Sequence, residues 1–239
     1  MDQTSVKRFF DGNQYLENSH DRIVIRSQIV KGFLGEVQNA RILDIGCGDG
    51  SLSLPLLNAS NRLTLVDISE NMIRKARERV PPALSGNVTL LNDSFEALGD
   101  AERFDIVLCI GVIAHVPSVD ALFAKIAAVL QPGGRLVVET TPNPFPLGKL
   151  LSPYYYVRHR FTANTARYAK NRLKLPDLLA RASAIGLQRL RSARYSVPLP
   201  GMSHWPQRLK LRYTLFTLNN PFMSRIGSEH VLLFRRQAA

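Results

Sequence analysis

The chain has 239 residues, of which 45% are hydrophobic, and a formal net charge of +12 at pH 7. This length allows one domain with a full hydrophobic core, and the composition excludes an intrinsically disordered chain. No apolar run reaches the roughly 18–20 residues of a membrane-spanning helix, and the N-terminus lacks the apolar core of a secretory signal. Two cysteines, Cys47 and Cys109, make no disulfide framework, so we expect a cytoplasmic protein with reduced thiols.

The charge is unevenly distributed along the chain. Residues 1–143 contain 14 Lys and Arg and 17 Asp and Glu, a net charge of −3. Residues 144–239 contain 17 Lys and Arg but only two acidic residues, a net charge of +15. We therefore expect a nearly neutral core and a strongly basic C-terminal part, whose partner would be an anionic membrane, a nucleic acid or an acidic substrate.

Apolar runs and helical patterns alternate along most of the chain. Residues 13–34 have Ile, Val and Leu at helical spacing and predict an N-terminal helix. Strands are predicted at 41–46, 63–67, 88–91, 104–110 and 134–140, with helices between them at 51–58, 69–80 and 119–130. This alternation predicts an α/β fold, in which helices cover both faces of a parallel sheet.

The C-terminal part adds a helix, two strands and two unusual segments. The helix begins at Pro176 and ends at Gly186, and strands at 187–197 and 229–236 are expected to pair antiparallel at the sheet edge. Segments 142–175 and 198–228 contain no acidic residue and follow the fifth and sixth strands. Ligands bind at the carboxyl ends of the strands in an open parallel sheet, so we expect both segments to border the substrate.

The stretch "RILDIGCGDG", from Arg41 to Gly50, is a short apolar strand that runs into a glycine-rich turn. Its G-x-G-x-G spacing is one residue shorter than the dinucleotide fingerprint G-x-G-x-x-G. Asp44 precedes the glycines and Asp49 lies among them. Carboxylates suit a pyrophosphate poorly, but they suit a ligand with a cationic end, such as the amino group and sulfonium of S-adenosylmethionine.

Two further acids follow the next two predicted strands. Asp67 ends the second strand, where a carboxylate accepts hydrogen bonds from ribose hydroxyls. Asp67 alone would also suit NAD. Asp93 ends the third strand, where it can accept from the exocyclic amine of adenine, and Phe95 or Ile68 can pack on the ring. Acids at the ends of three successive strands favour S-adenosylmethionine.

Residues 41–140 resemble the class I S-adenosylmethionine-dependent methyltransferases. "ILDIGCGDG" is similar to the first motif of that family, "LVDIS" and "LNDSFEAL" to its ribose and adenine acids, and "FDIVLCIGVIAHV" and "LQPGGRLVVET" to its later motifs. The resemblance implies a Rossmann-like, seven-stranded, mostly parallel sheet with an antiparallel last strand. It also implies contacts of S-adenosylmethionine with Asp44, Gly46, Cys47 and Gly48 at the methionine end, with Asp67 and Ile68 at the ribose and adenine, with Asp93, Ser94 and Phe95 at the adenine edge, and with Ile110 beside the sulfonium.

The downstream layout resembles ubiquinone-biosynthesis O-methyltransferases and, less closely, magnesium-protoporphyrin methyltransferases. The ubiquinone enzymes carry E-x-x-E-H after the fourth strand, where the carboxylates help to hold a divalent metal. Here the corresponding residues are Gly111, Ala114 and His115, so only the histidine remains. A hard cation needs oxygen ligands, and we therefore predict no catalytic metal.

We expect residues 1–239 to form one methyltransferase domain, with an N-terminal helical cap at 1–40 and a cofactor-binding core at 41–140. His115 is the candidate catalytic residue; alternatively it caps a turn or packs against the sheet. By resemblance, the acceptor is a small lipophilic or aromatic molecule that is methylated on oxygen. Segments 142–175 and 198–228, which are basic and carry most of the C-terminal aromatic residues, would contact an anionic membrane at its inner face, bind RNA, or form a lid. An RNA methyltransferase and a non-catalytic, cofactor-binding regulatory module remain alternatives.

Overall fold

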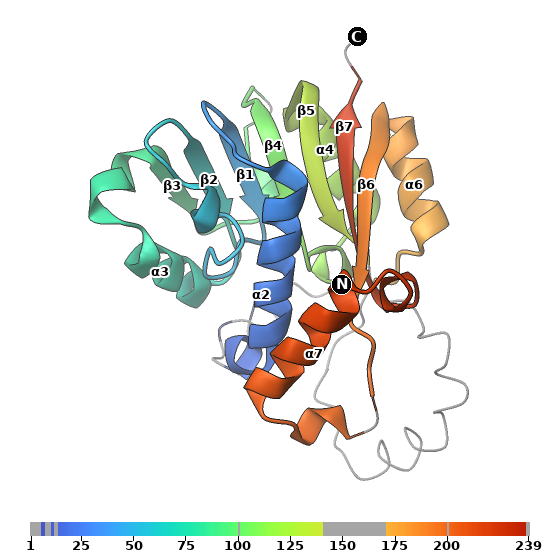
Figure 1. Cartoon of the computed structure of the whole chain (residues 1–239). Coiled ribbons are helices and arrows are strands. Elements are labelled where there is room, and N and C mark those ends of the chain that lie inside the picture. Colours follow the sequence, from blue (N-terminus) through green and yellow to red (C-terminus); the bar gives the residue numbers. More distant parts are fainter. Residues whose placement is uncertain are drawn as a thin grey trace.

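The computed structural model describes residues 6–7, 11, 14–99, 101–140, 171–199 and 201–237. Its centre is a seven-stranded sheet in the order β3-β2-β1-β4-β5-β7-β6 (Figure 1). The strands are β1 (Arg41–Ile45), β2 (Arg62–Val66), β3 (Val88–Leu91), β4 (Phe104–Cys109), β5 (Leu130–Glu139), β6 (Leu187–Tyr195) and β7 (Glu229–Arg236). Strands β1 to β5 pair in parallel, and β7 pairs antiparallel with both β5 and β6. The predicted Rossmann-like sheet with an antiparallel last strand is confirmed.

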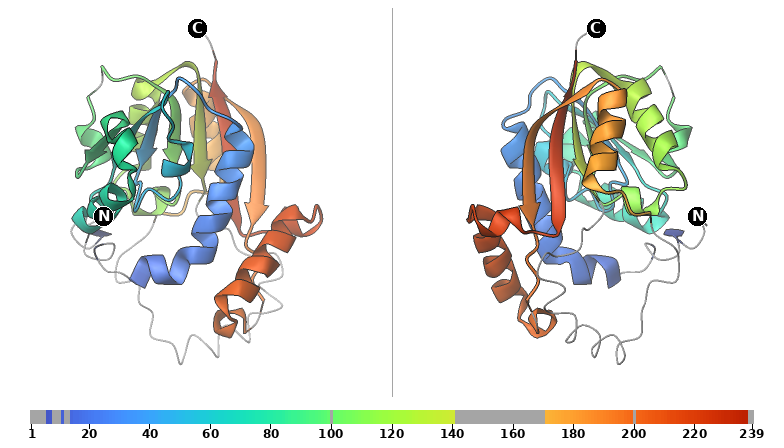
Figure 2. Two further views of the ribbon diagram at one scale, coloured as in Figure 1. Left: turned by 60° about the vertical axis from the view of Figure 1, so that its left-hand side comes forward. Right: turned by 90° about the vertical axis from the view of Figure 1, so that its right-hand side faces the viewer.

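Helices cover both faces of this sheet (Figure 2). They are α2 (Gln14–Leu34), α3 (Glu70–Arg79), α4 (Val119–Val129), α6 (Leu175–Ala184) and α7 (Gln207–Asn219). One buried cluster joins the sheet to α4 and α6 through side chains such as Phe123 and Leu178. The other joins the opposite face to α2 and α3 through Ile25 and Ile73, and α7 packs against it. Two apolar layers against one sheet explain why the strands read as continuous hydrophobic runs.

Local sequence signals fix several of these helix ends. The Ser69 hydroxyl accepts a hydrogen bond from the Met72 amide and caps α3, and the Ser118 hydroxyl accepts one from the Ala121 amide and caps α4. Gly186 follows α6 with φ +74°, the left-handed conformation that favours glycine after a helix. These three predicted ends are confirmed to within a residue or two.

The predicted helix at 51–58 is wrong. Only a short 3-10 turn, η1 (Leu54–Leu56), forms there. Pro55 has no amide hydrogen to donate, and Asn58 starts a competing turn, in which its Oδ1 accepts from the amides of Ser60 and Asn61. The Asn61 side-chain amide then donates to the Leu56 carbonyl, so that carbonyl no longer needs a helical partner.

The two acid-free segments differ in how much of them is described. Residues 142–170 lie outside the described residues. Segment 198–228 contains the short turns η6 (Met202–His204) and η7 (Met223–Arg225) and, between them, the helix α7, which packs against α2. No helix among the described residues is long and apolar enough to cross a bilayer.

Candidate functional site

The glycine-rich turn follows β1 at the carboxyl edge of the sheet, where β1 lies between β2 and β4. The amides of Gly46 and Cys47 both donate to the Val66 carbonyl at the end of β2, at 2.8 and 3.0 Å. Gly46 has φ +67°, and a Cβ there would stand 2.6 Å from Val112 Cγ2. Gly48 also has a positive φ, +55°, but a Cβ there would meet nothing within 4 Å. The turn is therefore packed against the protein at Gly46 and open at Gly48.

Asp67 connects this turn to the end of β2. One carboxylate oxygen accepts from the Gly48 amide at 2.8 Å, and the other accepts from the Ser69 amide at 2.9 Å. Burial raises the pKa of Asp67, and these two hydrogen bonds act in the opposite direction. Each carboxylate oxygen has a second lone pair. Asp67 thus shapes the turn and keeps acceptor capacity for a ligand.

The segment after β3 forms the next wall. Asp93 is exposed, and its carboxylate accepts from the Ser94 amide at 2.7 Å. Phe95 begins the short turn η3 (Phe95–Ala97) and packs largely into the core. Ile68, which follows Asp67, is partly exposed on the same side.

Asp44 lies beneath the turn rather than on its surface. It is 1% exposed, and its Oδ2 has no hydrogen-bond partner among the described residues. Burial raises the pKa of Asp44 to about 7, with Asp67 and Asp49 adding to the rise and the Ser53 hydroxyl opposing it. A buried, unpartnered carboxylate oxygen behind an open glycine turn fits a site for a cationic ligand.

Asp49 is held by an ion pair within the turn. Its carboxylate contacts the Arg79 guanidinium at the end of α3, and Arg79 also donates to the Ser51 hydroxyl at 2.6 Å. The presence of Asp49 among the glycines was one reason to expect a cationic ligand. Since Arg79 already balances this charge, Asp44 and Asp67 carry that argument instead.

These residues enclose one pocket at the carboxyl ends of β1, β2 and β4. Of the predicted site residues, Asp44 alone does not line it. The others line it together: Gly46, Cys47, Gly48, Asp67, Ile68, Asp93, Ser94, Phe95, Ile110 and His115. We call this cavity the donor pocket. Its far wall comes from the short turn η4 (Ile113–His115) after β4 and from Ile23 and Arg26 of α2.

Arg26 belongs to a buried polar network that the sequence analysis missed. Its Nε donates to Glu139 Oε1 at 3.0 Å and to the Tyr195 hydroxyl at 2.9 Å, and its Nη2 donates to Glu139 Oε2 at 2.6 Å. The Tyr195 hydroxyl donates to Glu139 at 2.6 Å. The network joins α2 to the ends of β5 and β6. An arginine within the apolar stretch "RIVIRSQIV" was the only local signal for it.

Glu229, the first residue of β7, lies close to this network. Burial raises its pKa to about 7; the charge of Glu139 adds to the rise, and Arg26 and Arg22 oppose it. A second carboxylate beside Glu139 therefore stays largely protonated below neutral pH.

The comparisons with known proteins agree with this geometry. A family model described as a methyltransferase domain matches residues 42–134, the part of the chain that carries the glycine turn and the strand-end acids. The chain is therefore an S-adenosylmethionine-dependent methyltransferase, whose methyltransferase domain is matched over residues 42–134. The open cradle at Gly48 and the carboxylates of Asp44, Asp67 and Asp93 fit S-adenosylmethionine, the cofactor of such methyltransferases.

The curated relatives of this methyltransferase include ubiquinone biosynthesis O-methyltransferases. The protein from Xanthomonas axonopodis pv. citri (strain 306) is 28% identical over 187 residues, 77% of each chain. The protein from Chelativorans sp. (strain BNC1) is 36% identical over 151 residues, 62% of this chain and 58% of that one.

Solved structures share the fold at low identity. Magnesium protoporphyrin IX methyltransferase from Synechocystis PCC 6803 with bound S-adenosylhomocysteine superposes with a TM-score of 0.67 and 17% identity, over 99% of this chain and 100% of that one. A possible histamine N-methyltransferase from Thermotoga maritima gives 0.61 and 18%, over 94% and 93%. Acceptors of different chemistry thus share this fold, and the acceptor of this chain must be argued from its own pocket.

Proposed function

We propose that this methyltransferase transfers the methyl group to an oxygen of a small, lipophilic or aromatic acceptor. The observation that carries the proposal is the wall around His115. This side chain lines the donor pocket beside Gly111, and the neighbouring lining is mainly apolar: Ile23, Ile110, Val112, Val116 and Pro117. Such a wall suits an apolar acceptor that presents one hydroxyl to the histidine. The likeness to ubiquinone biosynthesis O-methyltransferases supports oxygen as the methylated atom.

The donor would lie along the three strand ends. Gly46, Cys47 and Gly48 would hold the methionine end above Asp44, and Asp67 and Ile68 would hold the ribose and adenine. Asp93, Ser94 and Phe95 would contact the adenine edge, and Ile110 would lie beside the sulfonium. Bound S-adenosylmethionine supplies an electrophilic methyl group, so the chain mainly has to align the acceptor and remove its proton.

His115 would take the proton of the acceptor hydroxyl as the methyl carbon passes from the sulfonium sulfur to that oxygen, which leaves the sulfur as a neutral thioether. The turn that carries His115 is held from outside by Asn171. The Asn171 side chain donates to the Val116 carbonyl at 2.6 Å and to the Ile113 carbonyl at 3.2 Å. The end of the first acid-free segment is therefore tied to the loop beside the acceptor, which supports the prediction that segment 142–175 borders the substrate.

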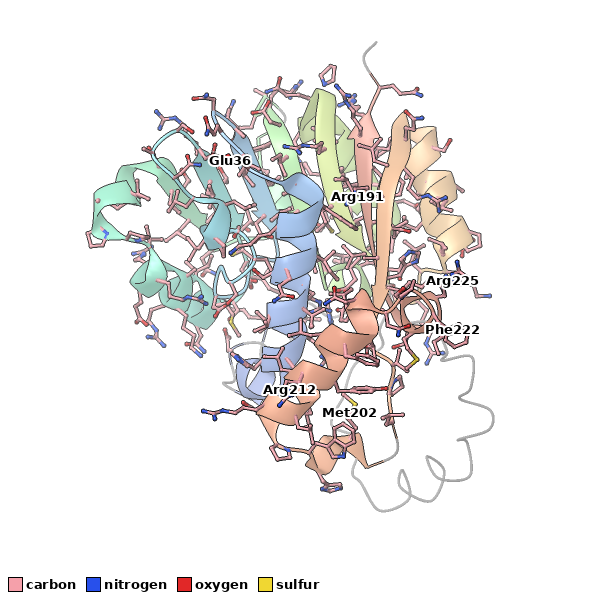
Figure 3. All side chains as sticks on the ribbon, in the orientation of Figure 1. Glu36, Arg191, Met202, Arg212, Phe222 and Arg225 are labelled. Carbon is pink, nitrogen blue, oxygen red and sulfur yellow. The ribbon has the colours of Figure 1, made fainter. Side chains whose placement is uncertain are left out.

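We also propose that the protein works in the cytoplasm, without a catalytic metal, in peripheral contact with an anionic membrane. Two phenylalanines stand out on the surface of α7 and η7: Phe216 is 60% exposed and Phe222 is 70% exposed. Arg212, one turn before Phe216 on α7, and Arg225 on η7 are exposed, and Figure 3 labels Arg212 on α7 and Phe222 and Arg225 at η7. Apolar side chains among arginines are typical of segments that lie at a membrane surface.

The test is methyl transfer from methyl-labelled S-adenosylmethionine into a cell extract that is separated into lipid, RNA, protein and small polar fractions. We expect label in the lipid fraction and full activity in a chelator. His115→Ala should reduce transfer about 10²–10⁴-fold while donor binding is retained. Label in RNA would overturn the proposed acceptor, and a Mg²⁺ requirement would overturn the metal-free mechanism.

The membrane contact has its own test. The double variant Phe216→Ser/Phe222→Ser should sediment less with vesicles that contain phosphatidylglycerol, whereas its donor binding should match the wild type. Equal sedimentation of variant and wild type would contradict a role for this face.

A further inference from the structure

A second pocket lies at the free edge of the sheet, around the edge strand β6. It is lined by Arg189, Ser192 and Arg194 from β6, by Ser224 and Arg225 at η7, and by His230 from β7. It shares no residue with the donor pocket. Figure 3 labels Arg225 on η7, beside the end of β6 and below α6, away from the strand ends that hold the glycine turn. We call this cavity the edge pocket.

The edge pocket carries positive charge without a matching carboxylate. Among the residues that the structure describes, three guanidinium groups line it and no acidic residue does. Arg194 Nη1 donates to the Arg225 carbonyl at 3.1 Å, which joins the side of β6 to η7. Residues 144–239 contain only two acids, Asp177 and Glu229, and Glu229 lies beside Glu139 and Arg26 instead.

His230 adds a buried polar atom that lacks a partner. The residue is 4% exposed, and its Nδ1 has no hydrogen-bond partner among the described residues. It stands directly opposite Arg194 in the β6–β7 pairing, so the two side chains share one side of the sheet. Buried polar atoms in folded proteins are usually paired, and an exception points to a missing partner.

The charges around His230 also keep its ring neutral. Burial, Arg194 and Arg189 lower the pKa of His230 to about 4. A neutral imidazole with its proton on Nδ1 is a hydrogen-bond donor. The pocket therefore presents a neutral imidazole, three guanidinium groups and the Ser192 hydroxyl, whereas the Ser224 hydroxyl already donates to the Pro221 carbonyl. The imidazole, the guanidinium groups and the Ser192 hydroxyl can donate to the oxygens of an anion, and the guanidinium groups supply the charge that attracts it.

The acid-free composition of residues 142–170, which lie outside the described residues, removes one source of a counter-charge. Residues 142–170 contain no Asp or Glu, so this part of the chain cannot neutralise the arginines. We propose that the edge pocket is a binding site for a phosphate group, either the headgroup phosphate of a lipid or the phosphate of a small soluble molecule. The site lies outside the methyl-transfer pocket, and the inference does not depend on the identity of the methyl acceptor.

Inorganic phosphate is the probe for the site itself. The melting temperature of the full chain would be followed as phosphate replaces chloride at constant ionic strength, because a ligand that binds only the folded state raises it. We expect a saturable rise for the wild type. The double variant Arg189→Gln/Arg225→Gln changes two exposed side chains and should require at least tenfold more phosphate.

The matched control is Arg212→Gln, which removes an exposed arginine of the same basic half outside the edge pocket. It should leave the phosphate response unchanged. No saturable rise in the wild type, or an equal weakening by Arg212→Gln, would overturn the proposal. Donor binding, measured on each variant, shows that the variant is folded and separates this result from the test of methyl transfer.

Vesicles distinguish the two sources of phosphate. If inorganic phosphate, at constant ionic strength, displaces the wild type from phosphatidic acid vesicles but does not displace the double variant, the site takes a lipid headgroup. If inorganic phosphate does not displace the wild type from these vesicles, while the double variant loses inorganic phosphate binding, the site takes a soluble phosphate compound. Either result supports a phosphate site in the edge pocket, whereas a double variant that binds both probes like the wild type overturns it.

Discussion

The donor pocket and the edge pocket of the sheet carry opposite charge. Asp44 lies within β1 beneath the donor pocket, and Asp67 and Asp93, which follow β2 and β3, line it; this pattern suits a ligand with a cationic end and hydroxyl or amine donors. Around the edge pocket, arginines of β6 and η7 meet a neutral histidine without an acid. The difference shows that two parts of one sheet can be specialised independently, because each part faces its own pocket.

The junction between the two halves is the network of Arg26, Glu139 and Tyr195. It holds α2, which forms one wall of the donor pocket, against β5 and β6. The ion pair of Arg26 and Glu139 lies within residues 1–143, and Tyr195 ties it to the C-terminal part, so breaking the pair tests how strongly this network holds the two parts together.

The largest expected effect is on stability. Glu139→Gln leaves the Arg26 charge buried without its partner, and we expect a loss of roughly 3–5 kcal/mol in the free energy of unfolding, measured in urea. The matched control is Arg74→Gln. It breaks an ion pair with the same 2.6 Å separation, but both of its side chains are 59% exposed, so the loss should stay within about 1 kcal/mol. Similar losses for the two variants would show that burial does not set the strength of the Arg26–Glu139 pair.

The donor site was more predictable from the sequence than this network. The glycine turn, Asp67 and Asp93 belong to short motifs next to strands, so local pattern alone brought them together. Arg26 lies 113 residues from Glu139 and 169 from Tyr195, and only the folded sheet makes them neighbours. The prediction of a helix at 51–58, in contrast, failed for a local reason. The apolar spacing of this segment was helical, but Pro55 and the Asn58 turn took its hydrogen bonds.

The second prediction concerns Glu229, which lies close to the network. Its pKa is raised from 4.5 to about 7 in the folded state, so the folded protein keeps a proton that the unfolded chain releases. The free energy of unfolding should therefore fall as the pH rises from about 4.5 to about 7, by on the order of 2–3 kcal/mol, and level off above. Glu229→Gln should remove this part of the pH dependence. If the free energy of unfolding of Glu229→Gln still falls equally between pH 5 and 7, groups other than Glu229 cause this pH dependence.

The third prediction, with a smaller expected effect, concerns the acidic residue Asp67 in the donor pocket. Asp67→Ala should weaken S-adenosylmethionine binding by roughly 1–3 kcal/mol in calorimetry, because it removes a partly buried hydrogen-bond acceptor. Asp49→Asn is the control, since its carboxylate is already paired with Arg79. The two variants would separate an acid that contacts the donor from an acid that only supports the turn. Unchanged affinity in a folded Asp67→Ala variant would refute the role proposed for Asp67.

The smallest expected effect separates backbone strain from occupation of the donor pocket. Gly48 and Gly133 both have positive φ, +55° and +76°, and a Cβ at either position would meet nothing within 4 Å. Alanine at each should therefore cost about 1–2 kcal/mol of stability through left-handed strain alone. Only Gly48 lines the donor pocket, so Gly48→Ala should also weaken donor binding, whereas Gly133→Ala should not. Equal donor affinity in the two variants would mean that the open space at Gly48 is not where S-adenosylmethionine binds.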